Sequence, residues 1–272
     1  MHKKPDHLKW YIQMGVDETI EENPINRFEM LTPEVITIVK PAAKVNTIHQ
    51  KAPILAEEVR PNIGNPASAM QNTRKIADGC GKLDELRSAV YNFTDLSIAK
   101  TATNTVFADG NPDAQIMLIG EAPGAEEDAQ GIPFCGASGK LLDQMLSCIG
   151  LIRQDNFYIS NTIFWRPPGN RRPTPEELAI CLPYVEKHIS LVKPKLIVLV
   201  GGTATSLLDS TLGITKMRGN FFEYNNQYLD KPIPTTAIFH PSYLLRSPGQ
   251  KRLAWKDLLM LKEYITNNGI KL

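Results

Sequence analysis

Four short runs of apolar residues recur from residue 115 onwards, and each is apolar at nearly every position. The runs lie at residues 115–120, 157–160, 195–201 and 235–240. A continuous apolar run of this length is typical of a strand buried on both faces of a sheet. Helical segments alternate with the runs, at residues 139–150, 174–192, 203–210 and 250–267. This alternation predicts an α/β fold with a parallel sheet covered on both faces.

The N-terminal part of the chain lacks this alternation. A short helical hairpin or a single helix is expected at residues 7–30, where LKWYIQMG supplies the apolar part. Residues 31–72 are rich in Pro, Ala, Asn and Val without a sustained period, which indicates a linker. A further helix is expected at about residues 72–93, interrupted by Gly79 and Gly81.

The length of 272 residues and the hydrophobic fraction of 42% suit one large domain with an extension. We expect an N-terminal helical and linker extension over residues 1–71 and a folded domain over residues 72–272.

The formal net charge is only +1, so a surface that binds nucleic acid must be local. No apolar run suggests a signal peptide or approaches the ~18 residues of a membrane helix. We therefore expect a cytoplasmic location without membrane contact.

The cysteines are widely spaced and form no C-x-x-C pair. They are Cys80, Cys135, Cys148 and Cys181. This spacing does not support a zinc site or an iron–sulfur cluster. Reduced thiols, several of them buried, are the simpler interpretation.

An unusual loop follows each of the four apolar runs. The loops read GEAPG, NTIFWRPPGNRRP, GGTAT and HPSYLLRSPGQKR in chain order. In open parallel sheets, ligands bind outside the carboxyl ends of the strands. The functional site is therefore expected at this edge of the sheet.

The first loop combines backbone freedom with a carboxylate. Gly120 and Gly124 permit a sharp turn and a close approach to a ligand, and Glu121 stands where a carboxylate can orient or activate water. The loop matches neither a dinucleotide fingerprint nor a P-loop, and an ordinary acidic loop is the alternative. Phe134, in a Gly- and Pro-flanked segment, is either a core residue or a stacking platform for a planar base.

Two further polar residues follow strands. Asn161 carries a donor and an acceptor on one planar amide, as a pyrimidine edge requires, and the alternative is a bond to its own loop backbone. His240 precedes a proline, which holds its backbone extended. A neutral imidazole there can donate to an oxygen that gains charge, although a lone histidine is more often structural.

Basic residues concentrate in two of the loops. They are Arg166, Arg171 and Arg172 in the second, and Arg246, Lys251 and Arg252 in the fourth. Ser138 precedes a helix start, where backbone amides can bind a phosphate. In a nearly neutral protein, this concentration favours a substrate that bears phosphates.

Together these pieces resemble family 4 of the uracil-DNA glycosylase superfamily. The matching segments are GEAPGAEEDAQGIPFCGASG, YISN with RPPGNRRPTPEE, and FHPSYLLR. The likeness runs from about residue 85 to 265, in the expected order. It implies a three-layer α/β/α sandwich around a four-stranded parallel sheet, in which residues 72–272 form the catalytic domain of a DNA repair enzyme.

The resemblance also implies roles in base excision. Glu121 and Ala122 would lie beside the scissile glycosidic bond, with Glu121 positioning the water. Phe134 would stack on the extruded uracil, and Asn161 would read its Watson–Crick edge. His240 would hydrogen-bond the charge that develops on uracil O2. Because no lysine nucleophile is needed, we expect base excision without strand cleavage.

Other matched positions would shape the pocket and hold the DNA. Gly120 belongs to the substrate-binding set, and Glu127 would stand near the uracil C5 edge, where a side chain can exclude the thymine methyl. The loop HPSYLLRSPGQKR would enter the DNA and fill the space left by the flipped base. The expected DNA contacts are Ser138, Arg166, Arg171, Ser242, Arg246 and Lys251.

The chain departs from the resemblance at the iron–sulfur cluster. Family 4 members typically hold a [4Fe–4S] cluster with four cysteines, and only Cys181 remains here. Phe93, Leu96 and Trp165 occupy the other three positions. A cluster needs roughly four thiolates, so we expect neither cluster nor metal, with apolar packing in the vacated volume.

Two other functions stay open at this point. One is a non-catalytic relative that binds uracil-containing or abasic DNA, having lost activity with its cluster. The other is an α/β enzyme that acts on free nucleotides or nucleosides, although the arginine loops favour a polymeric substrate. We expect a monomer that binds uracil-containing DNA, with residues 1–71 serving either a protein partner or an extra DNA contact.

Overall fold

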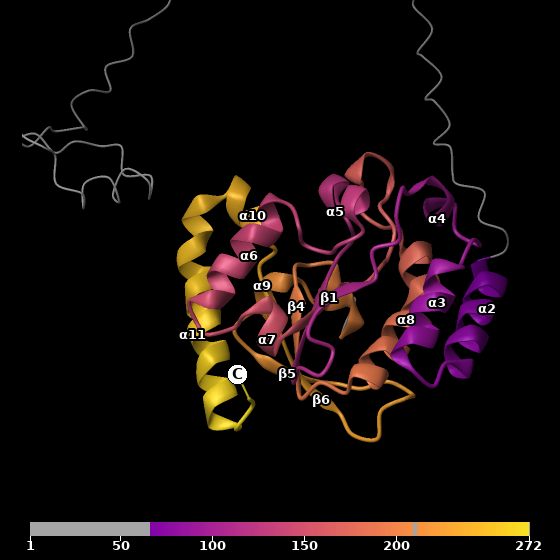
Figure 1. The fold of residues 1–272 in the computed structure, drawn as a ribbon. Coiled ribbons are helices and arrows are strands. Elements are labelled where there is room, and N and C mark those ends of the chain that lie inside the picture. The colour runs from indigo at the N-terminus through magenta and orange to yellow at the C-terminus, as the bar shows by residue number, and fades with distance from the viewer. Residues whose placement is uncertain (1–65, 209–210, 272) are drawn as a thin grey trace, which may run out of the picture. The chain divides into compact units, whose positions relative to one another are not determined.

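The computed structural model describes residues 66–208 and 211–271 (Figure 1). The helix expected at residues 7–30 lies outside the described residues, as does the expected linker up to residue 65. The described chain begins with α2, Pro66–Gly79, so this helix starts earlier than residue 72, where the sequence pattern placed it.

A break follows α2 where the glycines predict one. The helix ends at Gly79, and α3 covers Leu83–Tyr91. Two carboxylates, Asp84 and Glu85, lie in the first turn of α3, where negative charge is favourable. Glu85 accepts from the backbone N–H groups of Gly81 and Lys82, which fixes the corner between the two helices.

The sheet has six strands in the order β1-β3-β2-β4-β6-β5. Their bounds are Ala108–Gly110 (β1), Ile116–Gly120 (β2), Tyr158–Asn161 (β3), Leu196–Val200 (β4), Phe221–Tyr224 (β5) and Ile233–Ile238 (β6). The central four strands are parallel and correspond to the four predicted runs. The edge strands β1 and β5 pair antiparallel and were not predicted, because they are short, largely half-buried and lack a continuous apolar run.

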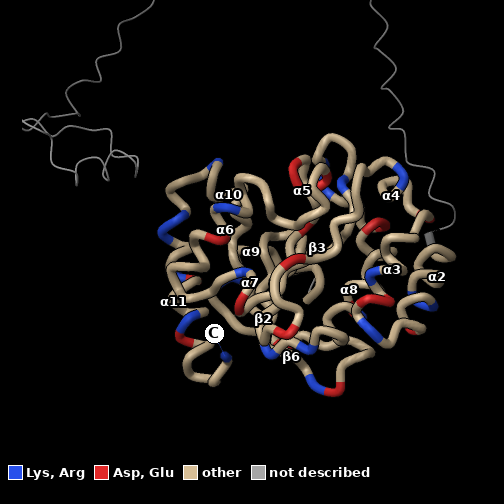
Figure 2. Tube along the Cα trace, viewed as in Figure 1, with Lys and Arg blue, Asp and Glu red and all other residues tan. Residues whose placement is uncertain are grey.

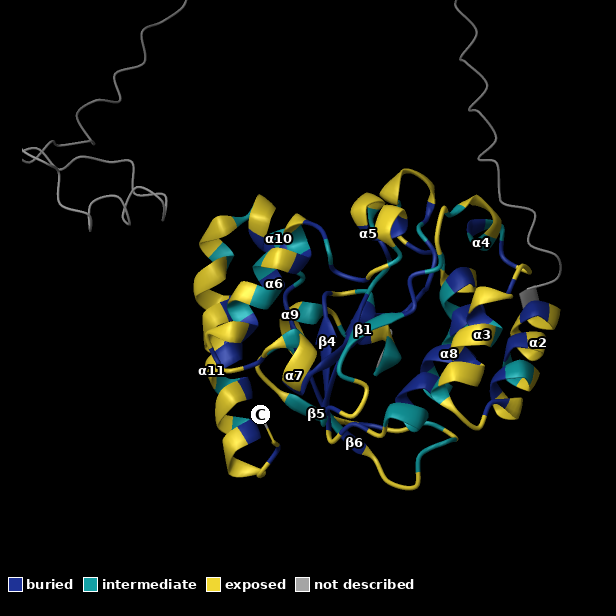
Figure 3. Cartoon of the chain, viewed as in Figure 1, coloured by how far each residue is buried: buried dark blue, intermediate teal, exposed yellow. Residues whose placement is uncertain are grey.

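Alternate residues of the central strands face opposite sides of the sheet. In β2, Ile116 and Leu118 belong to one hydrophobic cluster, while Met117 and Ile119 belong to another. The same alternation splits β4 between the two clusters. A strand with two buried faces therefore reads as continuously apolar. Every residue of β2, β3 and β4 is buried, and Figure 3 shows β4 in the colour of buried residues.

Helices cover both faces and complete the α/β/α sandwich (Figure 1). One face packs against α6 (Ala137–Ser147) and α11 (Lys251–Asn267). The other packs against α2, α3 and α8 (Pro175–Val192). Thr174 caps α8, since its side chain accepts from the Glu177 backbone N–H at 3.2 Å. The predicted α/β class and sandwich are confirmed, with two more strands than expected.

Several short helices lie in the connections. They are α4 (Ser97–Thr101), α5 (Ala125–Gln130), α7 (Arg153–Asn156), α9 (Ile214–Met217) and α10 (Pro241–Arg246). Where a helix was expected at residues 203–210, the described part is a short 3-10 helix, Ala204–Leu207.

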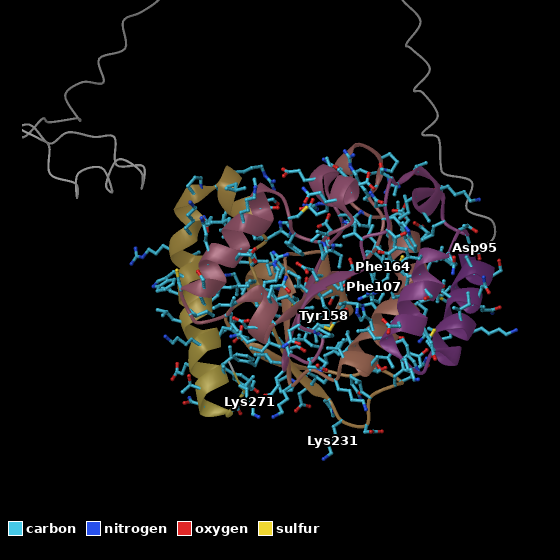
Figure 4. All side chains as sticks on the ribbon, viewed as in Figure 1. Asp95, Phe107, Tyr158, Phe164, Lys231 and Lys271 are labelled. Atoms are coloured by element: carbon cyan, nitrogen blue, oxygen red, sulfur yellow. The ribbon has the colours of Figure 1, made fainter. Side chains whose placement is uncertain are left out.

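Aromatic side chains fill the space between the sheet, α3 and α8; Phe107, Tyr158 and Phe164 are labelled in Figure 4. The Phe107 ring stacks on His188 with centroids 4.4 Å apart, and the Tyr158 hydroxyl lies 3.1 Å from the histidine Nε2. Burial lowers the pKa of His188 to about 3, so this ring is a neutral part of the core.

Within residues 66–208 and 211–271, no helix combines the length and apolarity needed to cross a membrane.

Candidate active site

A cavity of about 680 Å³ opens at the carboxyl ends of the parallel strands. It is bordered by the loops after β2, β3, β4 and β6, as the sequence predicts. Most of the predicted site residues line it: Glu121, Ala122, Glu127, Phe134, Ser138, Asn161, Arg171, His240, Ser242 and Arg246. Gly120, Arg166 and Lys251 do not belong to its lining.

Asn161 ends β3 directly beside Gly120 of β2. Its side chain is buried, and among residues 66–208 and 211–271 its Oδ1 atom has no hydrogen-bond partner. A Cβ atom on Gly120 would lie 2.5 Å from this oxygen and 2.4 Å from Cζ of Phe134. Only glycine therefore fits between the two side chains. A buried acceptor without a donor is costly, and a ligand N–H in the cavity would satisfy it.

Phe134 is held in an unfavourable backbone conformation. Its φ is 52°, in the left-handed region, at a cost of roughly 1–3 kcal/mol. A Cβ atom on Gly139 would lie 1.7 Å from the Phe134 carbonyl oxygen, so the two backbones touch. The ring is buried, and its centroid lies 5.8 Å from that of His240. Both rings line the cavity. The loop therefore presents the flat Phe134 ring beside the imidazole of His240.

His240 is the N-cap of α10, and its orientation fixes its tautomer. The Nδ1 atom accepts from the backbone N–H of Ser242 at 3.2 Å and lies 2.7 Å from the Ser242 hydroxyl. A neutral ring that accepts at Nδ1 carries its proton on Nε2. Burial, together with Arg246, lowers the pKa of His240, while Glu121 and Glu127 act in the opposite direction. The ring is therefore a neutral donor.

Glu121 is oriented by a residue that sequence reasoning missed. The Thr203 hydroxyl donates to Oε2 of Glu121 at 2.6 Å. The carbonyl oxygen of Glu121 accepts from the Thr162 hydroxyl, also at 2.6 Å. One carboxylate oxygen is thus fixed from the loop that follows β4. The signal available was GGTAT after the third apolar run, which places Thr203 at the same edge of the sheet.

Glu127 bridges two turns of one loop. Its Oε2 accepts from the Gly124 backbone N–H, and its Oε1 accepts from the Gly136 backbone N–H, both at 3.0 Å. Only 8% of the residue is exposed, although it lines the cavity. The carboxylate therefore has a structural function in the loop that carries Phe134, whatever else it contacts.

Two of the predicted DNA-contacting arginines are already engaged within the protein. Arg171 makes two bonds to the buried carboxylate of Glu177, at 2.8 and 2.6 Å. Arg166 donates to the Asn170 side chain at 2.7 Å. Arg171 lines the cavity, but the Glu177 carboxylate offsets most of its positive charge.

The remaining predicted contacts lie along α10 and neighbouring helix ends. Ser138 in α6 and Arg246 in α10 line the cavity, and Arg246 is exposed. Lys251 begins α11 and is also exposed. Figure 2 shows basic residues on α10 and the adjoining end of α11, so this side of the cavity is positively charged.

The positions that would hold an iron–sulfur cluster are occupied by packed side chains. Phe93, Leu96, Trp165 and Cys181 are all buried in one hydrophobic cluster. The rings of Phe93 and Trp165 have centroids 5.6 Å apart, and Trp165 Nε1 donates to the Thr105 hydroxyl at 3.0 Å. Burial raises the pKa of the Cys181 thiol. Three apolar side chains and one neutral thiol do not fit a metal cluster.

The other cysteines do not compensate. Cys80 is buried, Cys135 half-buried and Cys148 exposed, and none forms a disulfide. Within the described part of the chain, no group of three or more His, Cys, Asp or Glu side chains could hold a metal ion.

The chain matches known proteins over the part that forms this site. Residues 107–259 match the family model of the uracil DNA glycosylase superfamily. The type-4 uracil-DNA glycosylase of Thermotoga maritima is 42% identical over 171 residues, covering 61% of this chain and 86% of that protein. That of Sulfurisphaera tokodaii is 35% identical over 186 residues, covering 66% of this chain and 84% of that protein.

A third type-4 uracil-DNA glycosylase, from Saccharolobus solfataricus, is 35% identical over 197 residues, covering 70% of this chain and 89% of that protein. The order of the loops, the sheet that places them at one edge and these extended matches agree. The chain belongs to the uracil DNA glycosylase superfamily.

Proposed function

We propose that this chain is a DNA repair glycosylase that hydrolyses the N-glycosidic bond of uracil in DNA. The observation that carries the proposal is the unpartnered, buried Oδ1 atom of Asn161 in a cavity that also presents Phe134 and His240. Uracil N3–H supplies the missing donor, and uracil O4 accepts from the same amide. Cytosine has an acceptor at N3 and a donor at C4, so the same amide disfavours it.

The uracil ring stacks on Phe134 after the nucleotide has rotated out of the duplex. Such flipping costs a few kcal/mol, and less for a mispaired base. Gly120, which has no side chain, and Ala122, which has a small one, leave room beside the base and sugar. Glu127, with both oxygens fixed by backbone donors, stands near the C5 edge, where a rigid side chain excludes a thymine methyl group.

In the reaction, the C1′–N1 bond breaks and its electron pair goes to uracil. Positive charge develops on the sugar and negative charge on the base. His240 donates from Nε2 to uracil O2, which typically contributes about 3 kcal/mol to a transition state. Glu121 orients a water molecule that adds at C1′. The proton that this water releases balances the proton that the uracil anion takes up, giving free uracil and an abasic site.

The reaction stops at the abasic site. A lyase step needs an amine nucleophile, and no lysine is among the described residues that line the cavity. DNA is held by Ser138, Arg166, Arg171, Ser242, Arg246 and Lys251, and the loop at residues 240–252 enters the duplex.

The protein works as a monomer in the cytoplasm, and residues 1–71 contact either DNA or a protein partner.

The chain performs this function without an iron–sulfur cluster. The support is the packing of Phe93, Leu96 and Trp165 at positions where a cluster would need thiolates. Phe93, Leu96, Trp165 and Cys181 are not among the described residues that line the cavity, so the loss of ligands does not remove any group that the reaction uses.

A duplex oligonucleotide with a single uracil tests the proposal. We expect release of free uracil, with strand breakage only after the abasic site is treated with alkali. The same duplex with thymine should give no release. Deoxyuridine, offered instead of DNA, distinguishes an enzyme of free nucleosides: efficient hydrolysis of deoxyuridine but not of uracil in DNA contradicts the proposal.

A further inference from the structure

Arg153 does not line the cavity, yet its guanidinium reaches the loop that carries Phe134. The residue begins α7, and its side chain is only 11% exposed. Nη1 donates to the carbonyl oxygen of Pro133 at 2.8 Å, and Nη2 donates to the carbonyl oxygen of Phe134 at 2.9 Å. One planar group therefore fixes two successive carbonyls of the strained segment.

The guanidinium is itself held from two elements. Asp143 of α6 accepts from Nε at 3.0 Å and from Nη2 at 2.8 and 3.0 Å. Asp109 of β1 accepts from Nη1 at 3.2 Å. Since a guanidinium presents its donors in one rigid plane, these contacts determine where the loop carbonyls must lie. A lysine, with one flexible ammonium, cannot replace them.

Phe134 needs such support because its backbone is strained. A left-handed φ of 52° in a bulky residue persists only when its surroundings over-determine it. Arg153 holds the carbonyl by hydrogen bonds, and Gly139 allows the first turn of α6 to close against the same carbonyl. The backbone of Phe134 is thus fixed by two independent contacts. The fixed backbone in turn determines the position of the Phe134 ring.

We infer that Arg153 is a positioning residue for base recognition: through the Phe134 carbonyl it sets the ring on which uracil stacks. The inference rests on the proposed function, since it assumes that uracil occupies the cavity. Arg153 touches neither base nor sugar. Uracil stacks on Phe134 in both the ground state and the transition state. Displacement of the Phe134 ring therefore weakens binding of the free base as well as excision.

The test compares Arg153→Lys with the wild-type protein. Affinity for free uracil is measured by competitive inhibition and by calorimetry, and backbone hydrogen exchange is followed over residues 132–136. We expect uracil affinity and kcat/KM to fall by about tenfold or more, as small misplacements in a site typically do, with faster exchange in the loop. A folded Arg153→Lys protein with wild-type uracil affinity and exchange overturns the inference.

Two further variants separate positioning from general stability. Asp109→Asn weakens one outer contact but leaves both carbonyl bonds, and uracil affinity is expected to stay within about twofold, since partly exposed ion pairs contribute little. A Cβ atom on Gly139 would lie 1.7 Å from the Phe134 carbonyl oxygen, so Gly139→Ala displaces the same carbonyl and should lower uracil affinity even if Arg153→Lys does not fold. Wild-type affinity in Gly139→Ala contradicts the inference.

The outcomes also distinguish this inference from the function on which it rests. An active wild-type protein with unchanged variants contradicts the role of Arg153 alone. A folded wild-type protein that neither binds uracil nor releases it from DNA contradicts both.

Discussion

The hydroxyl of Thr203 donates a 2.6 Å hydrogen bond to Oε2 of Glu121, joining the loop after β4 to the loop after β2. In the proposed reaction, the second carboxylate oxygen orients a water molecule. Thr203→Val keeps the shape of the side chain but removes the donor. We expect kcat to fall by roughly 10–100-fold with little change in KM, because orientation matters mainly in the transition state.

Thr203→Ser is the matched control, since it retains the hydroxyl and should retain most of the activity. Single-turnover excision under saturating protein gives the rate constants for both variants. Equal rates for Thr203→Val and wild type would show that Glu121 needs no such partner.

Asn161→Asp tests the reading of the base. The aspartate side chain has the same size as asparagine but offers no donor to uracil O4. Its negative charge also repels that oxygen. Loss of a hydrogen bond that leaves a charged group unpaired typically costs at least about 3 kcal/mol. We therefore expect uracil excision to fall by roughly 100-fold or more while binding to undamaged DNA is retained. Wild-type excision by a folded Asn161→Asp protein would show that another group reads uracil.

The acid limb of the pH profile tests the state of His240. Burial lowers the pKa of this imidazole below the ordinary 6.5, so the neutral donor persists as pH falls through 6.5. We expect kcat/KM to stay level through that range and to decline only at lower pH. A His240-dependent loss of activity centred at or above pH 6.5, measured with wild type and His240→Gln in parallel, would contradict this assignment.

The same shift has a consequence for stability. Below pH 6.5 the unfolded chain takes up a proton at this histidine, whereas the folded protein does not until its lower pKa is reached. The contribution of His240 therefore reduces the free energy of unfolding as pH falls. Urea unfolding of wild type and His240→Gln at neutral and mildly acid pH should show the wild type losing more stability on acidification.

Substitution of Trp165 tests the packing at the positions where the resemblance implies cluster ligands. Its side chain is 1% exposed, packs against Phe93 and donates to Thr105. Trp165→Ala should lower the free energy of unfolding by about 3–5 kcal/mol, as is typical of large cavities. Trp255, which is 44% exposed on α11, is the matched control, and Trp255→Ala should change stability by about 0.5 kcal/mol or less. Similar losses in the two variants would contradict the packing role.

The sequence predicts the central sheet well because strands buried on both faces leave an unambiguous apolar run. It also places Glu121, Asn161 and His240 at one edge, since parallel strands bring their carboxyl ends together. The sequence does not predict the edge strands β1 and β5, because each is short, pairs antiparallel and lacks such an apolar run.

Other parts of the site depend on contacts that the local sequence does not encode. The Thr203 bond to Glu121 spans two loops, and the Arg153 contacts join α7, α6, β1 and the Phe134 loop. Glu127 reads as one acidic residue among three in α5, yet it bridges two backbone amides. Such relationships appear only when the chain is folded.

The most direct test of the account is multiple-turnover excision of uracil from DNA by protein whose iron content is measured in the same preparation. We predict many moles of uracil released per mole of protein that contains no iron and lacks absorbance near 400 nm, the region roughly expected of thiolate-ligated iron. Activity that rises and falls with bound iron, or tight binding of uracil-containing DNA without uracil release, would contradict it.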